Sequence, residues 1–230
     1  SFKPPGRDMS LRLIELGGPA AGYAGKLSAR WGSEVIRIDD TSQTPDYPAR
    51  TEHVAVDHYL HAGKTRVALD FSHSNGLSLL QQLTAQADVI IADLPLARLQ
   101  ALGWSGLGSD KTKIRAAITP FGQTGPRREW SATSSVLLAM GGETFIMGDP
   151  GRAPLTVPGR YLDYQAGQYA YTAIFAALRT PTSTTKAIDI SQYEVALSLH
   201  QFTTVMWTFN ERIRTRHGND FGVIHPITLY

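Results

Sequence analysis

Asp163 is the residue of this sequence whose type and place best suit covalent chemistry. It follows the turn-rich connector GDPGRAPLTVPG (148–159) and begins the apolar segment DYQAGQYAYTAIFAALR (163–179), which has the spacing of a helix. A carboxylate in the first turn of a helix lies at the positive end of the helix dipole, among N–H groups that have no partner within the helix. There it can act as an N-cap or as a nucleophile, and residue type alone favours the cap, because Asp is among the commonest N-cap residues.

A glycine turn near the start of the chain could receive a phosphate. The apolar run at 11–16 ends in Gly17 and Gly18, a helix is predicted to follow, and Asp39 and Asp40 come about 20 residues after the turn. This arrangement is similar to a dinucleotide-binding turn, in which the acid binds a ribose. The spelling G-x-G-x-x-G is absent, so we expect no NAD, whereas the helix N-terminus could still bind a phosphate.

Other catalytic patterns are weak or missing. The segment ITPFGQTGP (118–126) ends a predicted strand at the edge where open α/β sheets bind ligands, and its glycines permit close backbone approach. The serine hydrolase spelling G-x-S-x-G is absent. His58 and His61 could share a metal on a helix. Without a second pair or a nearby carboxylate cluster, however, surface histidines are the better interpretation, and we predict no metal site.

Strands and helices alternate along most of the chain. Apolar or β-branched runs predict strands at residues 11–16, 34–39, 65–71, 88–94 and 114–122, and helices are expected between most of them. This alternation predicts an α/β fold with a Rossmann-like, doubly wound, mostly parallel sheet and helices on both faces. Residues 41–62 show no clear period and are expected to form a long loop with one helical turn. Beyond Gly148 we expect long apolar helices at 163–179 and, largely buried, at 192–212, with a last strand at 187–191.

The composition is that of an ordinary globular protein. The chain has 230 residues, 22 Lys and Arg against 20 Asp and Glu, and no Cys. Its formal net charge of +2 does not indicate nucleic-acid binding, and the lack of cysteine excludes a disulfide framework, a zinc–thiolate site and a Cys nucleophile. No apolar run is long enough to span a membrane and the start does not read as a signal peptide. We therefore expect a cytoplasmic protein whose residues 1–9 form a disordered tail or a cloning remnant.

Several segments together resemble the family III CoA-transferases, a group that includes formyl-CoA and carnitine CoA-transferases and the α-methylacyl-CoA racemases. The opening LIELGGPAAGYAGKLSARWGSEVIRID, the stretch AGKTRVALDF with QADVIIADL after it, and ITPFGQTGP are similar to the family's first strands and turns. AMGGETFIMGDPGRAP, LDYQAG and AIDISQYEVALSL resemble its later motifs, in the same order. The resemblance covers nearly the whole chain. It implies that residues 10–211 form the family's large, Rossmann-like domain and that 212–230 are a linker toward a second domain.

The resemblance implies an enzyme that moves CoA from an acyl-CoA thioester to a carboxylic acid. The motif LDYQAG places the family's nucleophilic aspartate at Asp163, which would carry an aspartyl-CoA intermediate. CoA would enter as the acyl-CoA substrate, without metal or NAD, and the family's chains form interlocked homodimers. The residues expected to contact CoA match the family's turns or carry suitable charge, and they are Gly17, Gly18, Ala20, Arg37, Lys64, Arg66, Asp93, Leu94, Arg98, Gly122 and Gln123.

The sequence also departs from the family's pattern. Transferases often have Asn-Phe where Asp93 and Leu94 stand, Arg in place of Asp40 and Lys in place of Ser131, so contacts that are basic or neutral in the family are acidic or small here. The racemases have His followed by Asp where this chain has WSATSS (130–135), which disfavours racemisation. The alternative to an active transferase is a CoA-binding module that has lost turnover, and an NAD-dependent oxidoreductase is a weaker hypothesis.

Overall fold

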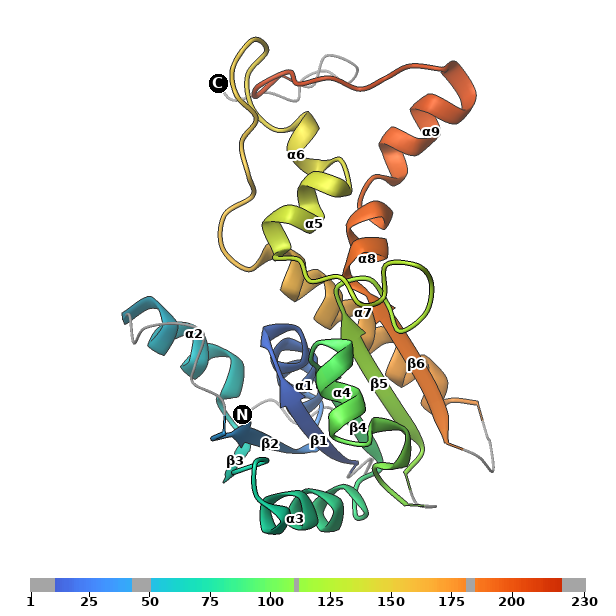
Figure 1. Ribbon diagram of the computed structural model, residues 1–230. Helices are drawn as coiled ribbons and strands as arrows, with labels where there is room; N and C mark the ends of the chain where they lie inside the picture. The colour runs from blue at the N-terminus through green and yellow to red at the C-terminus, as the bar shows by residue number, and fades with distance from the viewer. Residues whose placement is uncertain (1–10, 43–50, 110–111, 181–184, 221–230) are drawn as a thin grey trace.

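A parallel sheet forms the centre of the molecule (Figure 1). The computed structural model describes residues 11–42, 51–109, 112–180 and 185–220. Within these ranges the sheet has 6 strands in the order β3-β2-β1-β4-β5-β6, and all neighbours are parallel. The predicted doubly wound α/β sheet is therefore confirmed, because this is the strand order of a dinucleotide-binding fold. The strands are β1 (Arg12–Gly17), β2 (Glu34–Asp40), β3 (Thr65–Leu69), β4 (Val89–Asp93), β5 (Ile114–Thr119) and β6 (Lys186–Ser191).

The central strands are apolar on both faces because helices cover both sides of the sheet. Val89 and Ile91 belong to the hydrophobic core on one face, and Ile90 belongs to the core on the other. The register pairs Gly17, at the end of β1, with Asp93, at the end of β4. The strand order reverses between β1 and β4, and ligands of open α/β sheets bind at the carboxyl ends of the strands beside such a point.

Two layers of helices enclose the sheet (Figure 1). α1 (Pro19–Arg30) and α7 (Tyr161–Leu178) contribute to the core on one face. α3 (Ser74–Thr84), α4 (Leu96–Ala101) and the short η1 (Trp104–Gly106) contribute to the core on the other. In the central strands β1, β4 and β5, apolar residues alternate between these two cores, as the pleat of a strand requires.

α1 and α7 pack closely because small residues line their contact. A Cβ added at Gly167 would lie 2.5 Å from the carbonyl oxygen of Ala20 and 3.0 Å from the Cβ of Tyr23, so a larger residue would push the helices apart. Ala166 and Ala170 are fully buried on the same helix. This contact holds the first turn of α7, which contains Asp163, near the first turn of α1.

Two expectations about the helices are wrong. Residues 51–61 form a helix, α2 (Thr51–His61), where a loop was expected, and Leu60 is its buried residue. The helix expected at 192–212 is broken into α8 (Gln192–Ser198) and α9 (Gln201–Asn210), and the break falls at His200, whose Nε2 lies 3.1 Å from Glu143 Oε2. α9 has no buried residue, so a succession of long, buried apolar helices is not found among the described residues.

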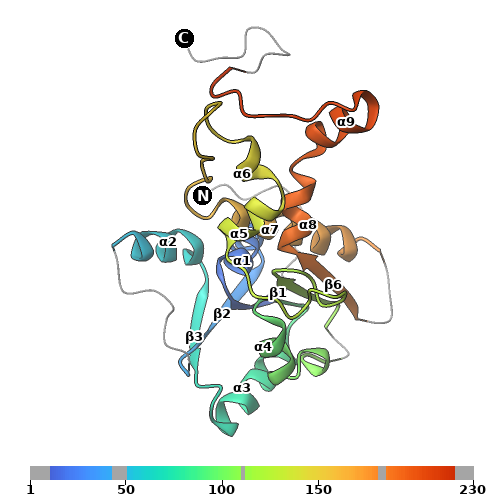
Figure 2. The same ribbon diagram turned by 45° about the horizontal axis from the view of Figure 1, so that its top comes forward.

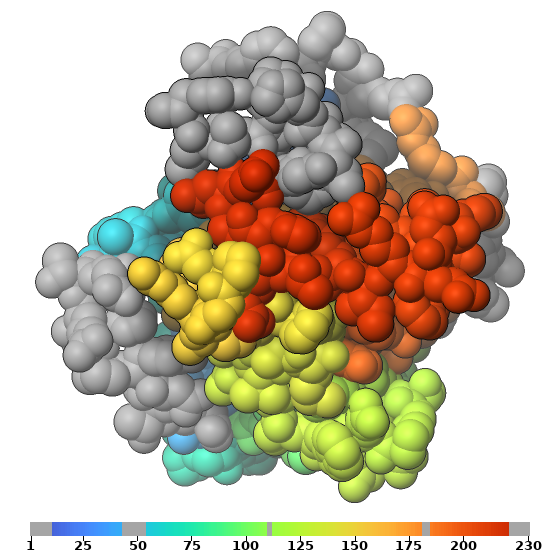
Figure 3. All heavy atoms as spheres, turned by 90° about the horizontal axis from the view of Figure 1, so that it is seen from above, coloured from blue at the N-terminus to red at the C-terminus, as the bar shows by residue number. Residues whose placement is uncertain are grey.

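α2 lies beside α1, and the remaining helices rise from the carboxyl edge of the sheet (Figures 1 and 2). They are α5 (Ser134–Met140), α6 (Glu143–Ile146), α8 and α9. Residues 211–220 form no helix or strand and return to α6, where the N–H of Gly218 donates to the carbonyl oxygen of Gly148 at 3.0 Å. Seen from above, these red residues lie against yellow and yellow-green ones (Figure 3). The domain boundary expected at residue 212 stays a prediction, and residues 1–9 and 221–230 lie outside the described ranges.

Candidate active site

Asp163 lies in the first turn of α7, and its carboxylate is held by side chains from three other positions. Oδ1 accepts hydrogen bonds from Ser134 Oγ at 3.0 Å and from Gln192 Nε2 at 3.4 Å, and Oδ2 lies 3.7 Å from Arg160 Nη1. The residue is 7% exposed. Asp163 is not the N-cap, because α7 begins at Tyr161 and Arg160 occupies the cap position. The expectation that Asp163 caps the helix is therefore wrong.

The surroundings of Asp163 favour a reactive carboxylate. Burial raises its pKa, and the hydrogen bond from Ser134 and the charge of Arg160 lower it in part. The positive end of the α7 dipole also stabilises negative charge in the first turn. The carboxylate is thus shielded from water while its charge is only partly compensated, which suits attack on an electrophilic carbonyl carbon.

The Gly17–Gly18 turn folds over Asp93 at the end of β4. The N–H of Gly18 donates to the carbonyl oxygen of Asp93 at 2.8 Å, and the N–H of Ala20 donates to Asp93 Oδ2 at 2.9 Å. Gly17 has φ +86°, and a Cβ there would collide with the backbone of Asp93 and with the side chain of Leu94. The N-terminus of α1, which was expected to suit a phosphate, is therefore engaged by the Asp93 carboxylate.

Asp93 and Asp163 form a pair of interacting carboxyl groups. Burial raises the pKa of Asp93 to about 7, and the negative charge of Asp163 adds to this shift. Hydrogen bonds from the N–H groups of Ala20 and Ala21 oppose it. The proton of Asp93 is therefore held more tightly than that of a free aspartate, and the charge of Asp163 contributes to this.

Asp93→Asn should remove a pH dependence of the stability. The carboxyl group has a pKa of about 7 in the folded protein, against 3.8 for an unperturbed aspartate, so the folded state binds this proton more tightly. The wild-type free energy of unfolding should then fall, relative to that of D93N, as pH rises from about 4 to about 7, by at most about 1.4 kcal/mol per pH unit. Urea denaturation below, within and above this interval measures the difference, and parallel pH curves for the two proteins would contradict it.

Lys64 lies beneath α1 in an ion pair with Glu15. Its Nζ is 2.5 Å from Glu15 Oε2, 2.7 Å from the carbonyl oxygen of Gly22 and 3.3 Å from His61 Nδ1, and the side chains of Lys64 and Glu15 are 0% exposed. His61 is not the surface residue that the sequence suggested, because its side chain is only 9% exposed, and burial and the nearby charge of Arg37 lower its pKa to about 4. A contact between Lys64 and a CoA phosphate would require this buried ion pair to open.

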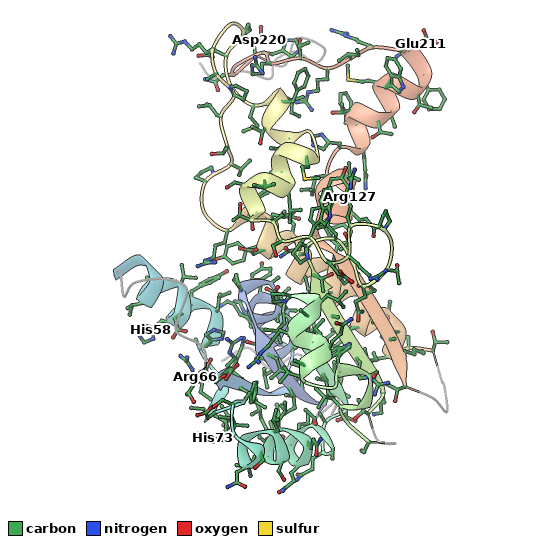
Figure 4. The ribbon with its side chains drawn as sticks, viewed as in Figure 1. His58, Arg66, His73, Arg127, Glu211 and Asp220 are labelled. Atoms are coloured by element: carbon green, nitrogen blue, oxygen red, sulfur yellow. The ribbon has the colours of Figure 1, made fainter. Side chains whose placement is uncertain are left out.

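The arginines expected near CoA are also paired with carboxylates. The partners are Glu15 and Asp39 for Arg37, Asp39 and Asp57 for Arg66, and Asp40 for Arg98. The three side chains are 13%, 45% and 28% exposed, in that order. Arg66 belongs to β3, the outermost strand on one side of the sheet, where Figure 4 labels it. These arginines thus lie on three different elements, β2, β3 and α4, and each is paired with a carboxylate other than Asp163.

Gly122 and Gln123 lie on the other flank of the site, beside β6. The N–H of Gln123 donates to Asp189 Oδ2 at 2.9 Å, and Gly122 has φ +82°. A Cβ at Gly122 would lie 3.6 Å from the Cβ of Ser191, which immediately precedes Gln192. The loop after β5 is therefore close to one of the donors that hold Asp163.

Sequence reasoning did not identify Ser134, Gln192 or Arg160 as parts of the site. Ser134 begins α5 and Gln192 begins α8, so both come from segments far from Asp163 in the chain. Gln192 is 7% exposed, and its position next to the N-cap residue Ser191 fixes it at the start of a helix. Arg160, three residues before Asp163 in a turn-rich connector, could have been proposed from charge and spacing alone.

Other kinds of site were sought within the described ranges. There, no group of three or more His, Cys, Asp or Glu side chains is placed to hold a metal ion. In the same ranges, no helix has the length and apolar character needed to cross a membrane.

The chain is similar to several characterised proteins. It is 28% identical over 244 residues to succinyl-CoA–D-citramalate CoA-transferase of Chloroflexus aurantiacus, a match that covers 100% of this chain and 60% of that protein. It is 29% identical over 199 residues to the mouse α-methylacyl-CoA racemase, covering 84% of this chain and 49% of the racemase. The chain thus spans about three fifths of the transferase and about half of the racemase.

A solved structure and a family model agree with these similarities. A CAIB/BAIF family protein from Brucella suis has the same fold, with a TM-score of 0.80 at 24% identity over 94% of this chain and 61% of that one. The model of CoA-transferase family III matches residues 10–230. The chain therefore belongs to CoA-transferase family III.

Proposed function

We propose that this protein is a CoA-transferase that moves CoA from an acyl-CoA thioester to a carboxylic acid, with Asp163 as the nucleophile. The observation that carries the proposal is the buried Asp163 carboxylate, held by Ser134, Gln192 and Arg160 in the first turn of α7. Several relatives support the reaction class, among them the D-citramalate transferase and the succinate–glutarate CoA-transferase of Agrobacterium fabrum, which is 28% identical.

The first half-reaction transfers CoA to the enzyme. A carboxylate oxygen of Asp163 attacks the thioester carbonyl carbon, the C–S bond breaks, and CoA leaves as a thiolate, which gives a mixed anhydride. The thiolate then attacks the aspartyl carbonyl carbon of that anhydride, which releases the donor acid as a carboxylate. The product is an aspartyl-CoA thioester at Asp163.

The second half-reaction reverses these steps with the acceptor acid. The acceptor carboxylate attacks the aspartyl carbonyl carbon, CoA again leaves as a thiolate, and a new mixed anhydride forms. The thiolate attacks the acceptor's acyl carbon, which produces the new acyl-CoA and restores the Asp163 carboxylate. No net proton, electron or water is consumed.

The residues around Asp163 have distinct roles in these steps. Ser134 Oγ and Gln192 Nε2 both reach Oδ1, so they orient the carboxylate for attack. When Asp163 becomes the electrophile in the acyl-enzyme, the same donors can stabilise the oxyanion on its carbonyl, a contribution of about 3 kcal/mol for a well-placed donor. Arg160 stabilises the free carboxylate between turnovers.

Acyl-CoA racemisation is the second candidate, because a racemase is among the relatives and burial and the charge of Asp163 raise the pKa of Asp93 to about 7. It requires a base and an acid at the α-carbon of the acyl group. The segment WSATSS (130–135) supplies neither. Exchange of the α-proton of an acyl-CoA in heavy water, without acid exchange, would favour racemisation over transfer.

Trapping of the acyl-enzyme tests the proposal directly. The protein is incubated with succinyl-CoA, treated with hydroxylamine, digested and analysed by mass spectrometry. We expect a hydroxamate on the peptide that contains Asp163 and none on the peptide that contains Asp189, a carboxylate of β6. An unmodified Asp163 in a protein that binds succinyl-CoA would instead indicate a binding module that has lost turnover.

A further inference from the structure

An ion pair between Arg98 and Asp40 crosses the carboxyl edge of the sheet at the point where the strand order reverses. Asp40 is the last residue of β2, and Arg98 lies on α4, which follows β4. In the sheet β1 lies between β2 and β4, so the ion pair spans the carboxyl end of β1. Arg98 Nη2 is 2.5 Å from Asp40 Oδ2 and 3.3 Å from Ser42 Oγ. The pair therefore lies where ligands of this fold class bind.

Asp40 is fixed by contacts that do not depend on Arg98. Its Oδ1 accepts from the N–H and Oγ of Ser42 at 3.0 and 2.6 Å and from the N–H of Phe71 at 3.4 Å. Arg98, in turn, lies with its Cζ 5.9 Å from the centre of the Phe71 ring. Because Ser42 and the N–H of Phe71 hold Asp40, its carboxylate would stay in place if the Arg98 guanidinium moved to another partner.

Among the basic residues expected to contact CoA, Arg98 is the one whose release requires the least rearrangement. Lys64 is 0% exposed, and Arg37 and Arg66 each pair with two carboxylates. Arg98 is 28% exposed and, among the residues that the structure describes, its carboxylate partner is Asp40 alone. An anionic ligand that enters this edge thus meets in Arg98 a partly exposed guanidinium with one carboxylate competitor.

We propose that Asp40 competes with the phosphate groups of CoA for Arg98 and so sets a weak affinity for the nucleotide part of the substrate. The inference rests on the proposed function, since CoA supplies the phosphates. A phosphate on Arg98 must displace the Asp40 carboxylate and then lies beside it, because Asp40 remains fixed by Ser42. Like charges at this distance repel, and the cost depends on salt concentration. Asp40 thereby lowers CoA affinity without contacting the thioester.

Asp40→Asn tests this competition, because the amide keeps an oxygen for the Ser42 and Phe71 donors and removes the charge. Binding of CoA and of pantetheine, which lacks phosphate, is measured by calorimetry for the wild type and for D40N, R98Q and D40N/R98Q. We expect D40N to bind CoA about three- to tenfold more tightly, as for loss of one partly exposed charge, and pantetheine equally well. In the R98Q background the gain should disappear.

Glu34→Gln is the matched control, because Glu34 pairs with Arg12 at 2.8 Å near the amino end of the sheet and the substitution changes the net charge equally. It should leave CoA affinity unchanged. A D40N gain that also appears with pantetheine, or that persists without Arg98, would overturn the inference. Equal CoA affinity of the wild type and D40N would also overturn the inference, but it would leave the transferase proposal intact. If neither protein binds CoA, the transferase proposal is overturned as well.

Discussion

Asp163→Asn should lower the rate of CoA exchange between an acyl-CoA and a carboxylic acid by at least about a thousandfold. An amide cannot form the mixed anhydride, and no other described carboxylate shares the contacts to Ser134 and Gln192. Exchange of labelled succinate into succinyl-CoA measures the rate. The loss should appear in kcat, because Asp163 takes part in bond formation and binding of the nucleotide does not depend on it.

The stability of D163N separates a catalytic from a structural aspartate. A helix cap replaced by another residue would cost stability, but Arg160 holds the cap position and burial raises the pKa of Asp163. The charged form is therefore disfavoured in the folded state, and a neutral amide of the same shape removes that cost. We expect a melting temperature equal to or above that of the wild type, together with the loss of activity.

Asp88→Asn is the matched control for this experiment. Asp88 pairs with Lys113 at 3.0 Å and accepts from the N–H of Arg12 at the amino edge of the sheet, opposite the site. It should leave the exchange rate unchanged. Retention of wild-type exchange by D163N would refute the assignment of the nucleophile, and a large fall in its melting temperature would indicate a structural role.

The sheet could be predicted from sequence because its signals are local. Runs such as LRLIEL and VIIAD are apolar enough to form strands buried on both faces, and glycines or prolines interrupt the chain between elements. The break at His200 was not predictable in this way, since it depends on a contact with Glu143 of α6. Helix α2 was missed because residues 51–61 lack a clear apolar face and, among the side chains described at 54–61, only that of Leu60 is buried.

The site could be predicted only in part, for the same reason. Asp163 and the Gly17–Gly18 turn follow from position within elements and from motifs, whereas the partners of Asp163 depend on how α5 and α8 pack. The family resemblance placed Lys64, a cation, at a phosphate contact, yet its side chain turns inward to Glu15. Charge in a sequence shows that a partner is needed, but it does not show whether the partner belongs to a ligand or to the fold.

Lys64→Met should lower the free energy of unfolding by about 3 kcal/mol at neutral pH, because it leaves the buried Glu15 carboxylate without its closest cation. Both side chains are 0% exposed, and Gly25 leaves room for them under α1, since a Cβ there would collide with Glu15. Arg37, 3.1 Å from Glu15, compensates part of the charge and keeps the loss near the lower end of the usual range. Urea denaturation measures the change.

The double variant E15Q/K64M and the pH dependence identify the cause of this loss. Removing both charges should restore most of the stability, because a neutral amide can stay buried where a lone carboxylate cannot. Burial raises the pKa of Glu15 and Lys64 lowers it, so in K64M that pKa rises further. The loss of stability should therefore shrink as pH falls toward 4 and Glu15 takes up a proton.

Lys113→Met, at an exposed pair with Asp88, should cost less than about 1 kcal/mol of stability. Unchanged stability of K64M with weakened CoA binding would instead assign Lys64 to the ligand.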